Sequence, residues 1–499
     1  MTSTPSAVPA EAPEKDAGFQ RRIGLFDATM LVAGAMIGSG IFIVSADISR
    51  DVGTSGWLLT VWGLAGLMTV IGALSYAELA AMMPHAGGQY VYLREAYGPL
   101  FGFLYGWTLF LVIQTGTIAA VAVAFAKFLG VLVPDLGTTN VLLTVGNWQV
   151  TAGQCVGAAL IVLLTAVNCS GVTTGKWIQN IFTVAKTIAL ILLIVVGLTV
   201  AANAEIIRAN WQDFWSGIAK TAAHQKFAWI APGTLLPAFM VVGGAMVGAL
   251  FSADAWNNVT FTAGETKNPQ RNLPLSMVLG TGLVIALYLL ANVAYLSALP
   301  IGGVKDGQTV MERGIAHAKD DRVGTAVLEK VSSQYGAPAM AIAIMVSTFG
   351  CVNGLILMGP RLYYAMAQDR LFFQSAGQLN SRGVPAAGLV MQGVWSVLLV
   401  FSGTYGQLLD YVIFAALLFY ALTVVGLFVL RARQPNAERP YRAVGYPVLP
   451  ALYVFLCVVV MLDLLVVKPL YTWPGLCIVL TGVPVYLYWR HRSQSVRVA

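Results

Sequence analysis

The sequence predicts an all-α polytopic membrane protein with twelve transmembrane helices. Hydrophobic residues make up 58% of the 499 residues and charged residues only 10%, whereas soluble domains have about 25% charged residues. A chain of this length could not cover a soluble surface with so few polar side chains. The apolar residues also gather in blocks of about 20, the length that crosses a bilayer as a helix. A soluble, collagen-like, disordered or secreted disulfide-rich protein is therefore excluded.

The spans are predicted from apolar stretches bounded by charge, glycine or proline. We expect them at residues 25–48, 57–83, 99–130, 151–170, 177–200, 235–262, 273–299, 338–368, 386–402, 405–430, 446–467 and 471–489. Before the first span, residues 1–20 are rich in Pro, Ala, Glu and Ser, which cannot form a core, and predict a disordered cytosolic tail.

The basic residues indicate how the chain is oriented. Arg21 and Arg22 precede the first apolar block, which lacks the cleavage site of a signal peptide and is therefore expected to remain as a helix. Lys and Arg are more frequent in the segments that lie in the cytosol when the N-terminus does, so the positive-inside rule places both termini there. Because the net charge of +7 is spread over loops, no nucleic-acid partner is predicted.

The cysteines and histidines predict no metal site, no cofactor and no disulfide framework. The cysteines lie in or at the ends of apolar blocks without CxxC spacing, and the histidines are far apart in the sequence. They are Cys155, Cys169, Cys351, Cys457, Cys477, His85, His224, His317 and His491.

Two apolar blocks contain residues that weaken a helix at mid-span. The first block reads Gly38, Ser39, Gly40, and each glycine costs about 1 kcal/mol relative to alanine. The sixth block has glycines within residues 243–248, followed by a carboxylate at Asp254. Both blocks are candidate broken helices. For the first block alone, a helix contact of GxxxG type is an equally good interpretation.

The two candidate breaks start five spans apart, at matching positions of two five-helix halves with opposite orientation. This arrangement is typical of secondary transporters built from inverted repeats, whose substrate site lies at the breaks. The sequence therefore predicts a first repeat over residues 21–200, a second over 201–430, and two further helices with a cytosolic C-terminus over 431–499. The loops 201–234 and 300–337 are expected to pack over the outer mouth.

Five runs of residues resemble the amino acid-polyamine-organocation superfamily, and most of all its L-type amino acid transporter branch and the bacterial relatives of that branch. They are GSGIF from residue 38, GGQYVYLREAYGPLFGFLYGW from residue 87, ADAWNNVTFTAGETKNPQRNLPLS from residue 253, GPRLYYAMAQDRLFF from residue 359 and RPYRAVGYPVLP from residue 439. The resemblance implies a five-plus-five inverted repeat with two extra helices, amino acid transport by alternating access, and a place in a bacterial inner membrane.

The chain departs from that family in two places. The sixth-helix motif commonly carries an aromatic residue and a glycine, whereas this chain has Ala253, Asp254, Ala255 and Trp256, so the resemblance does not fix the substrate. In animal L-type members, a cysteine between helices three and four ties the transporter to an ancillary glycoprotein. Because the corresponding loop here, 131–150, has no cysteine, we expect no disulfide-linked ancillary subunit.

In broken helices, the backbone alone can bind both the carboxylate and the ammonium group of an amino acid. A helix that resumes after the first break presents N–H groups and a positive dipole end to a carboxylate. Carbonyls left free where the helices stop suit an ammonium. The backbone groups predicted to bind substrate belong to Ala35, Met36, Ile37, Gly38, Ser39, Gly40, Phe251 and Ser252.

Side chains of the second break are expected to select the substrate. A carboxylate at mid-membrane is unfavourable by a few kcal/mol unless it faces a cavity or a partner, so Asp254 is expected to line the cavity. The alternative is a structural partnership with a nearby hydroxyl or lysine. Trp256 and Phe251 are candidate gates over the ligand, and packing within the bundle is their commoner alternative.

Lys186 lies in the middle of the fifth apolar block, where an unpaired ammonium costs about 2.5 to 3.5 kcal/mol, so it must point inward. In the family that the chain resembles, a lysine at this place bonds to carbonyls of the first break and occupies the position where sodium-coupled relatives hold a cation. Ser347 and Thr348 of the eighth span are expected beside it. Since a fixed positive charge repels Na⁺ at short range, transport independent of sodium is predicted.

Together these observations predict a sodium-independent amino acid transporter, for uptake or exchange, with neutral L-amino acids favoured. A cationic amino acid or polyamine transporter is the first alternative, because Asp254 could pair with a cationic side chain. An ion channel is the alternative of a different class, although no repeated filter or ring of charges is visible. An enzyme is not predicted, because no nucleophile with a base, paired acids or metal cluster lies at matching depth.

Overall fold

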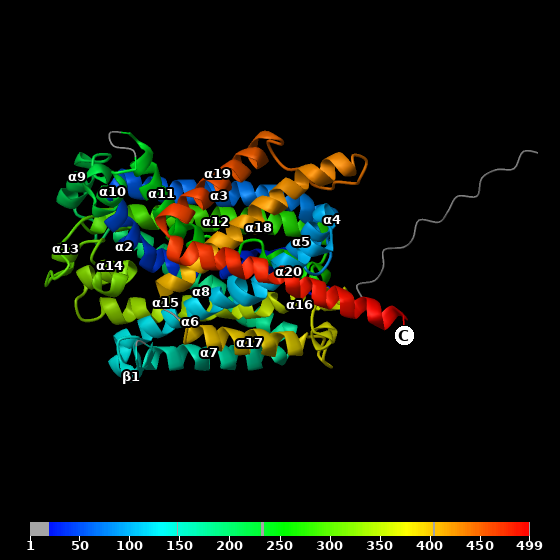
Figure 1. Cartoon of the computed structure of the whole chain (residues 1–499). Coiled ribbons are helices and arrows are strands. Elements are labelled where there is room, and N and C mark those ends of the chain that lie inside the picture. Colours follow the sequence, from blue (N-terminus) through cyan, green and yellow to red (C-terminus); the bar gives the residue numbers. More distant parts are fainter. Residues whose placement is uncertain (1–18, 147, 231–233, 403–404, 499) are drawn as a thin grey trace, which may run out of the picture.

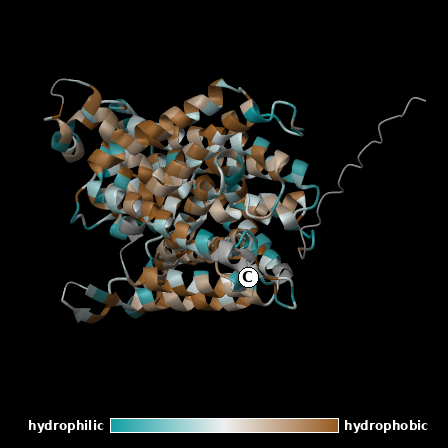
Figure 2. Ribbon diagram, turned by 45° about the vertical axis from the view of Figure 1, so that its right-hand side comes forward, coloured by the Kyte–Doolittle hydropathy of each residue, from teal (hydrophilic) through white to brown (hydrophobic). Residues whose placement is uncertain are grey.

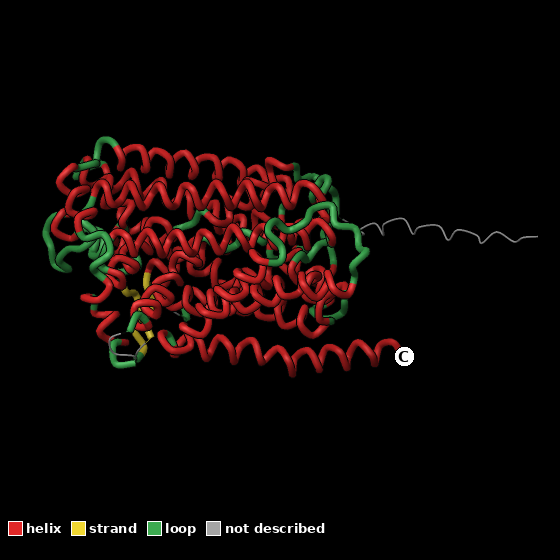
Figure 3. The backbone as a smooth tube through the Cα atoms, turned by 90° about the horizontal axis from the view of Figure 1, so that it is seen from above, coloured by secondary structure: helices red, strands yellow, loops and turns green. Residues whose placement is uncertain are grey.

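Long helices run side by side in the computed structural model, and the loops that join them gather at the two ends of the bundle (Figure 1 and Figure 3). The structure describes residues 19–498 except for 147, 231–233 and 403–404. The predicted tail over residues 1–20 therefore lies almost entirely outside the described residues. Figure 2 shows hydrophobic residues along the helices and hydrophilic residues mainly at the loops.

The first part of the chain forms long helices, two of them interrupted, and one β-hairpin. Its elements are α1 (Leu25–Met36), α2 (Gly40–Val52), α3 (Ser55–Met82), α4 (Gln89–Tyr97), α5 (Pro99–Thr108), the π-helical turn η1 (Leu109–Ile113), α6 (Gln114–Leu132), η2 (Pro134–Leu136), β1 (Val141–Val145), β2 (Trp148–Thr151), α7 (Ala152–Cys169) and α8 (Val172–Leu198).

The rest of the chain alternates long helices with short helices in the connecting loops. Its elements are α9 (Ala204–Gln212), η3 (Ile218–Lys220), α10 (Ala222–Phe227), α11 (Leu236–Ser252), η4 (Asn258–Glu265), α12 (Pro269–Ala298), α13 (Val310–Arg313), η5 (Lys319–Asp321), α14 (Val323–Val331), α15 (Gly336–Met358), α16 (Pro360–Gln368), η6 (Gln374–Gly377), α17 (Ala386–Val400), α18 (Tyr405–Arg433), α19 (Val448–Val467) and α20 (Pro469–Val498).

The helices have the length and composition of a membrane protein. Among the described residues, nine helices are long and apolar enough to cross a bilayer, and two shorter apolar helices, α11 and α17, accompany them. Each of the apolar blocks predicted from the sequence falls on helical residues of the structure. The prediction of a helical polytopic membrane protein is thus confirmed, while the count of twelve spans stays a prediction.

The loop between α6 and α7 contains one feature that the sequence did not predict, an antiparallel hairpin of β1 and β2. Gly146 lies between the two strands with a φ of 59°, the left-handed conformation that glycine adopts readily. The strands are short and rich in valine, which favours β structure. The sequence analysis did not predict these strands, because such a short valine-rich stretch does not stand out from the long apolar blocks around it.

One end of the bundle carries the hairpin and the short helices α9, α10, α13 and α14, and we name it the hairpin end (left in Figure 1). Both long loops are tied to helices there. Trp57 of α3 donates to the Trp215 carbonyl at 3.0 Å, and Arg50 of α2 donates to the Ala316 carbonyl at 2.6 Å. Arg50 also pairs with Asp321 at 2.7 Å. The two long loops therefore lie against the hairpin end.

The opposite end of the bundle carries α4 and is held by ion pairs across helices (right in Figure 1). Glu78 of α3 pairs with Arg431 of α18 at 2.6 Å. Arg361 of α16 pairs with Glu265 of η4 at 3.1 Å, and both side chains are buried. The Glu265 carbonyl also accepts from the N–H group of Ile23 at 2.9 Å. The start of the chain is thus fastened to the segment that follows the sixth apolar block.

Candidate functional site

The first apolar block is interrupted between α1 and α2. The helix α1 ends at Met36 and α2 begins at Gly40, and Ile37–Ser39 between them are not helical. All of these residues are buried. Because the chain leaves the helix, carbonyls in this segment lose their intrahelical donors and need hydrogen-bond partners from elsewhere.

Five successive carbonyls at this break accept hydrogen bonds from side chains of α8, α12 and α15. The pairs are Lys186 with Gly34 and with Ile37 (2.7 Å to Ile37), Cys351 with Ala35 (3.0 Å), Tyr288 with Met36 (2.9 Å), and Ser347 with Ile37 and Gly38 (3.2 Å each). The carbonyls that the sequence assigned to a substrate ammonium are therefore occupied by side chains of the same chain.

Lys186 points inward and is fully buried. Besides the two carbonyls of the first break, its ammonium donates to the Ser347 carbonyl of α15 at 3.4 Å. An ammonium has three N–H donors, and each has an acceptor here. Thr348 does not share this role, because its hydroxyl donates within its own helix, to the Ile344 carbonyl at 2.9 Å. The lysine thus joins α8, α15 and the first break.

The second break falls later than the glycines of the sixth block suggest. The helix α11 continues through Gly243, Gly244 and Gly248 to Ser252, and residues 253–257 then form an irregular segment before the 3₁₀-helix η4. Within that segment Ala255 has a φ of 66°, a left-handed conformation that costs a residue with a Cβ about 1 to 2 kcal/mol.

The two breaks touch each other. A Cβ built on Gly40 would overlap the hydroxyl of Ser252 and lie 2.7 Å from its Cβ, so only glycine lets α2 begin this close to the end of α11. The Tyr288 hydroxyl of α12 lies 2.9 Å from the Met36 carbonyl and 3.1 Å from the Ser252 carbonyl. One hydroxyl therefore bridges a carbonyl of each break.

Asp254 is the carboxylate of the second break, and it accepts a hydrogen bond from the Tyr420 hydroxyl of α18 at 2.5 Å. The same hydroxyl lies 3.1 Å from the side-chain oxygen of Asn257. Asn257 in turn donates to Gln89 of α4 at 2.7 Å, and Gln89 donates to Thr423 of α18 at 3.0 Å. This chain of polar groups matches the alternative in which Asp254 is a structural partner of a nearby hydroxyl.

Trp256 packs in an aromatic cluster with Tyr76 and Tyr420, at centroid distances of 4.8 and 5.4 Å. Phe251, on the last turn of α11, is also buried. The cavity that Asp254 and Trp256 line has a volume of only about 20 Å³, which is room for about one water molecule. In this conformation the space beside Asp254 is closed to an amino acid.

Sequence reasoning missed the tyrosines that hold the breaks, although one signal was present. Tyr288, Asn292 and Tyr295 recur at the spacing of one helix face within the apolar block that forms α12. Tyr295 donates to the Ile41 carbonyl at 3.2 Å, and Asn292 accepts from Ser45 at 2.7 Å. This polar stripe on α12 therefore contacts the first break at Met36 and the helix α2 at Ile41 and Ser45. Cys351 and Tyr420 carried no comparable signal.

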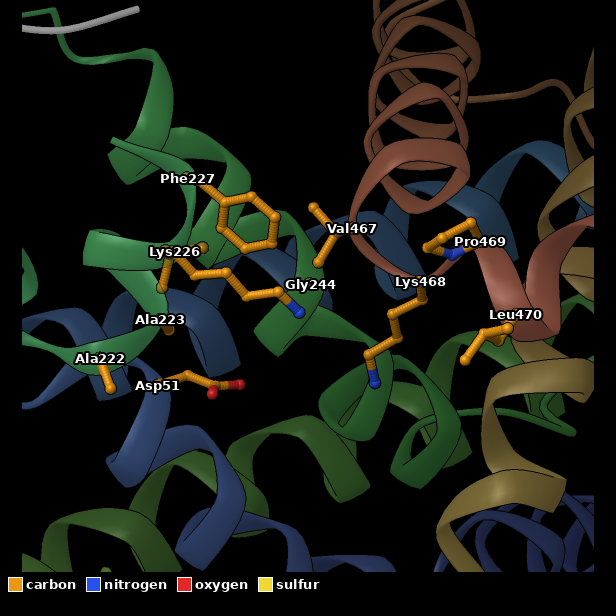
Figure 4. A pocket seen from close by; sticks show the side chains of 11 residues that line it. Asp51, Ala222, Ala223, Lys226, Phe227, Gly244, Val467, Lys468, Pro469 and Leu470 are labelled. Atoms are coloured by element: carbon orange, nitrogen blue, oxygen red, sulfur yellow. The ribbon is translucent and has the colours of Figure 1, made fainter. Parts of the chain in front are cut away.

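A larger cavity lies away from the breaks, at the hairpin end. It has a volume of about 560 Å³ between α10, the start of α11 and the junction of α19 with α20. Figure 4 shows Lys226 and Lys468 reaching into it, with Asp51 of α2 below Lys226. None of its lining residues belongs to the predicted substrate site.

Comparison with known proteins gives consistent matches over nearly the full length. The family model described as "Amino acid permease" matches residues 23–483. The chain is 29% identical over 483 residues to the b(0,+)-type amino acid transporter 1 of Homo sapiens, which covers 96% of this chain and 89% of that protein. It is 30% identical over 493 residues to the Large neutral amino acids transporter small subunit 2 of Homo sapiens, covering 97% of this chain and 84% of that protein. Because the second name denotes a subunit, the comparison does not support the expected absence of an ancillary subunit.

Proposed function

Since this chain belongs to the amino acid permease family, within the amino acid-polyamine-organocation superfamily, and its relatives are named as amino acid transporters, we propose that it is a sodium-independent carrier of neutral L-amino acids. It works by alternating access, with the substrate bound between the two helix breaks. The observation that carries this proposal is the contact of the two breaks through Gly40, Ser252 and Tyr288.

The backbone at the breaks supplies partners for both charged groups of an amino acid. The helix α2 begins at Gly40, and the N–H groups of its first turn lie at the positive end of the helix dipole. The Phe42 N–H donates to the Ser39 carbonyl at 3.1 Å, so the groups proposed for the substrate are those of Gly40 and Ile41. They suit the substrate carboxylate. The substrate ammonium takes the Met36 and Ser252 carbonyls, replacing the Tyr288 hydroxyl that lies between them. Binding therefore requires the breaks to separate from the closed arrangement.

The contacts of Lys186 support independence from sodium. Its ammonium lies where the Gly34, Ile37 and Ser347 carbonyls converge, and a cluster of carbonyl oxygens is what a bound alkali cation would need. The positive charge of this ammonium repels a second cation at short range. The protein thus holds its first break with an internal cation.

The environment of Asp254 favours neutral substrates over cationic ones. Its carboxylate is already engaged by the Tyr420 hydroxyl, and the neighbouring cavity is lined mainly by apolar and aromatic residues. A cationic amino acid or polyamine would have to turn Tyr420 away to reach the carboxylate. Cationic substrates remain the second candidate, since one relative is named for a b(0,+)-type system and the other for large neutral amino acids.

The topology of the carrier is proposed on the same basis. The break between α1 and α2 and the break after α11 lie at corresponding places of residues 21–200 and 201–430, which we propose are inverted repeats, with residues 431–499 added to them. The excess of Lys and Arg supports cytosolic termini. We further propose that no subunit is attached by a disulfide through the loop 131–150, which has no cysteine. A shift between reducing and non-reducing gels of the native protein would disprove this.

Uptake into proteoliposomes tests the function. Labelled leucine, alanine and arginine are offered to vesicles with and without internal amino acid, in sodium or in choline medium. We expect saturable leucine and alanine uptake that is unchanged in choline. A steep dependence on sodium would remove the role proposed for Lys186, arginine preference would establish the cationic alternative, and a flux that never saturates would indicate a channel.

A further inference from the structure

Asp463 is a carboxylate within the apolar helix α19 that none of the functions above uses. It lies four residues before the end of that helix. Both of its carboxylate oxygens are buried, and neither has a hydrogen-bond partner among the described residues. Buried polar groups of native proteins are rarely left without a partner, so this side chain calls for a physical explanation.

The Asp463 carboxylate packs against the backbone of α11, the helix that ends at the second break. A Cβ built on Gly243 would overlap one oxygen of Asp463 and lie 2.8 Å from its Cγ. On the next residue, a Cβ at Gly244 would lie 3.0 Å from Val467, one turn further along α19. Asp463 and Val467 of α19 therefore pack directly on the backbone of Gly243 and Gly244 in α11. We call this contact between the two helices the seam.

No described ionisable group neutralises this carboxylate. The helices packed against α19 are α3, α11, α18 and α20, and α11 has no ionisable residue at all. Those described on the other three are Tyr76, Glu78, Tyr420, Arg431, Arg433, Cys477, Tyr486, Tyr488, Arg490 and His491.

The nearest groups of these helices have other partners. Glu78 and Arg431 pair with each other at 2.6 Å, and Tyr420 donates to Asp254. Lys468, at the junction of α19 and α20, and Lys226 lie beyond Val467 and reach into the cavity at the hairpin end (Figure 4). Among the described residues, no ion pair joins a lysine to Asp463.

The closed seam suits a protonated side chain and not an ionised one. An ionised carboxylate without a partner is unfavourable by a few kcal/mol inside a membrane protein, and removing the partner of a buried charge costs about 3 to 5 kcal/mol in soluble proteins. A neutral carboxyl group avoids this cost. Ionisation therefore requires α11 and α19 to separate, so that water reaches the side chain.

From this geometry, and on the basis of the proposed carrier function, we propose that Asp463 is a proton-binding site that couples amino acid transport to protons. The carboxyl takes a proton from the hairpin end, which lies outside in the proposed topology, and holds it while α11 packs on α19. It releases the proton to the cytosolic side when the seam opens in the inward-facing carrier. The helix α11 ends at the second break and also packs against α2, which follows the first break. Opening the seam therefore moves one helix at each break. The coupled ion is thus a proton, bound away from the substrate.

The cavity at the hairpin end gives the proton a route to water. Gly244 and Val467, the neighbours of the Asp463 contact, line its wall. The cavity of about 560 Å³ is lined mostly by apolar residues, but the charged ends of Asp51, Lys226 and Lys468 reach into it (Figure 4) and give water polar partners there. The proton therefore needs to cross only the seam between the cavity and Asp463.

Proteoliposomes with an imposed pH gradient test the coupling. One proton carried with each amino acid raises the accumulation ratio of leucine about tenfold for each pH unit, acid outside, because one unit is 1.36 kcal/mol per proton. We expect this response in the unmodified protein and in the matched control Asp213→Asn, a carboxylate in an exposed loop. In Asp463→Asn, which cannot titrate, the accumulation ratio should no longer follow the gradient.

The outcomes separate this inference from the carrier function. Leucine uptake with no response to the gradient in the unmodified protein, or an equal response in Asp463→Asn, overturns the inference and leaves the carrier function intact. Absence of saturable uptake under every condition overturns both. If Asp463→Asn is inactive, infrared spectra of the purified protein decide: the carbonyl band of a protonated carboxyl, present in the unmodified protein and missing in the variant, supports the proposal, and identical spectra overturn it.

Discussion

Replacing Lys186 by methionine is the most direct test of how the first break is held. Methionine keeps much of the side-chain volume but removes all three N–H donors. The Ile37 carbonyl retains its bond from Ser347 at 3.2 Å, whereas no other side-chain donor is seen for the Gly34 carbonyl in the described structure. Leaving one buried acceptor unsatisfied costs about 1 to 3 kcal/mol.

This cost falls on the segment that must hold its shape to bind substrate. If this whole cost of about 1 to 3 kcal/mol lowers the fraction of molecules whose first break can bind substrate, leucine uptake falls about 5- to 150-fold, since 1.4 kcal/mol is a factor of ten. We expect Lys186→Met to purify as a folded protein with a lower melting temperature in detergent and with uptake reduced by that factor. Lys220→Met, at an exposed lysine in the loop before α10, is the matched control and should leave both values unchanged.

Two neighbours of the lysine grade the effect. Ser347→Ala removes weaker bonds to the Ile37 and Gly38 carbonyls and should cost about 0.5 to 1.5 kcal/mol, a smaller loss of uptake. Thr348→Val should have little effect on uptake, because the Thr348 hydroxyl donates only within α15. We therefore expect the loss of uptake to be largest at Lys186, smaller at Ser347 and smallest at Thr348. Full uptake by Lys186→Met, or a larger loss at Thr348 than at Ser347, would refute it.

Three further predictions concern the contact between the two breaks and the second break itself. Gly40→Ala should abolish uptake by forcing α2 away from Ser252, and the double change with Ser252→Gly should restore part of it, since the overlapping hydroxyl and Cβ are then gone; no recovery in the double variant would show that the contact is not the cause. Asp254→Asn should keep most of the affinity for leucine, because an amide still accepts from Tyr420, whereas arginine competition that disappears selectively in this variant would contradict the neutral assignment. Ala255→Gly should stabilise the protein by about 1 kcal/mol by relieving the left-handed conformation, and an unchanged or lower melting temperature in detergent would count against strain at this residue.

The places where helices form could be predicted from the sequence because they depend on local composition. Each predicted apolar block falls on helical residues, since a backbone in lipid must satisfy its own hydrogen bonds and a helix does so within one segment. The first break was also predictable, because Gly38 and Gly40 weaken the helix where they stand. These features need no knowledge of how distant segments meet.

The second break shows where local composition is a poor guide. Gly243, Gly244 and Gly248 suggested unwinding, yet they are helical and serve as contact surfaces, with Gly243 beneath Asp463 and Gly248 beside Val44. A glycine inside a membrane helix can weaken it or let a neighbour approach closely, and small residues at helix contacts are common in membranes. Which of the two applies depends on the facing helix, which the local sequence does not specify.

The side chains that donate to the carbonyls of the first break could not be predicted from the sequence. The break freed carbonyls that were assigned to a substrate ammonium. Lys186, Ser347, Cys351 and Tyr288 reach them from segments 149 to 316 residues further along the chain. Buried carbonyls rarely stay without a hydrogen-bond donor, and here side chains of the same chain supply the donors. In the proposed carrier, Tyr288, which also bridges to Ser252, is the donor whose release would open both breaks at once.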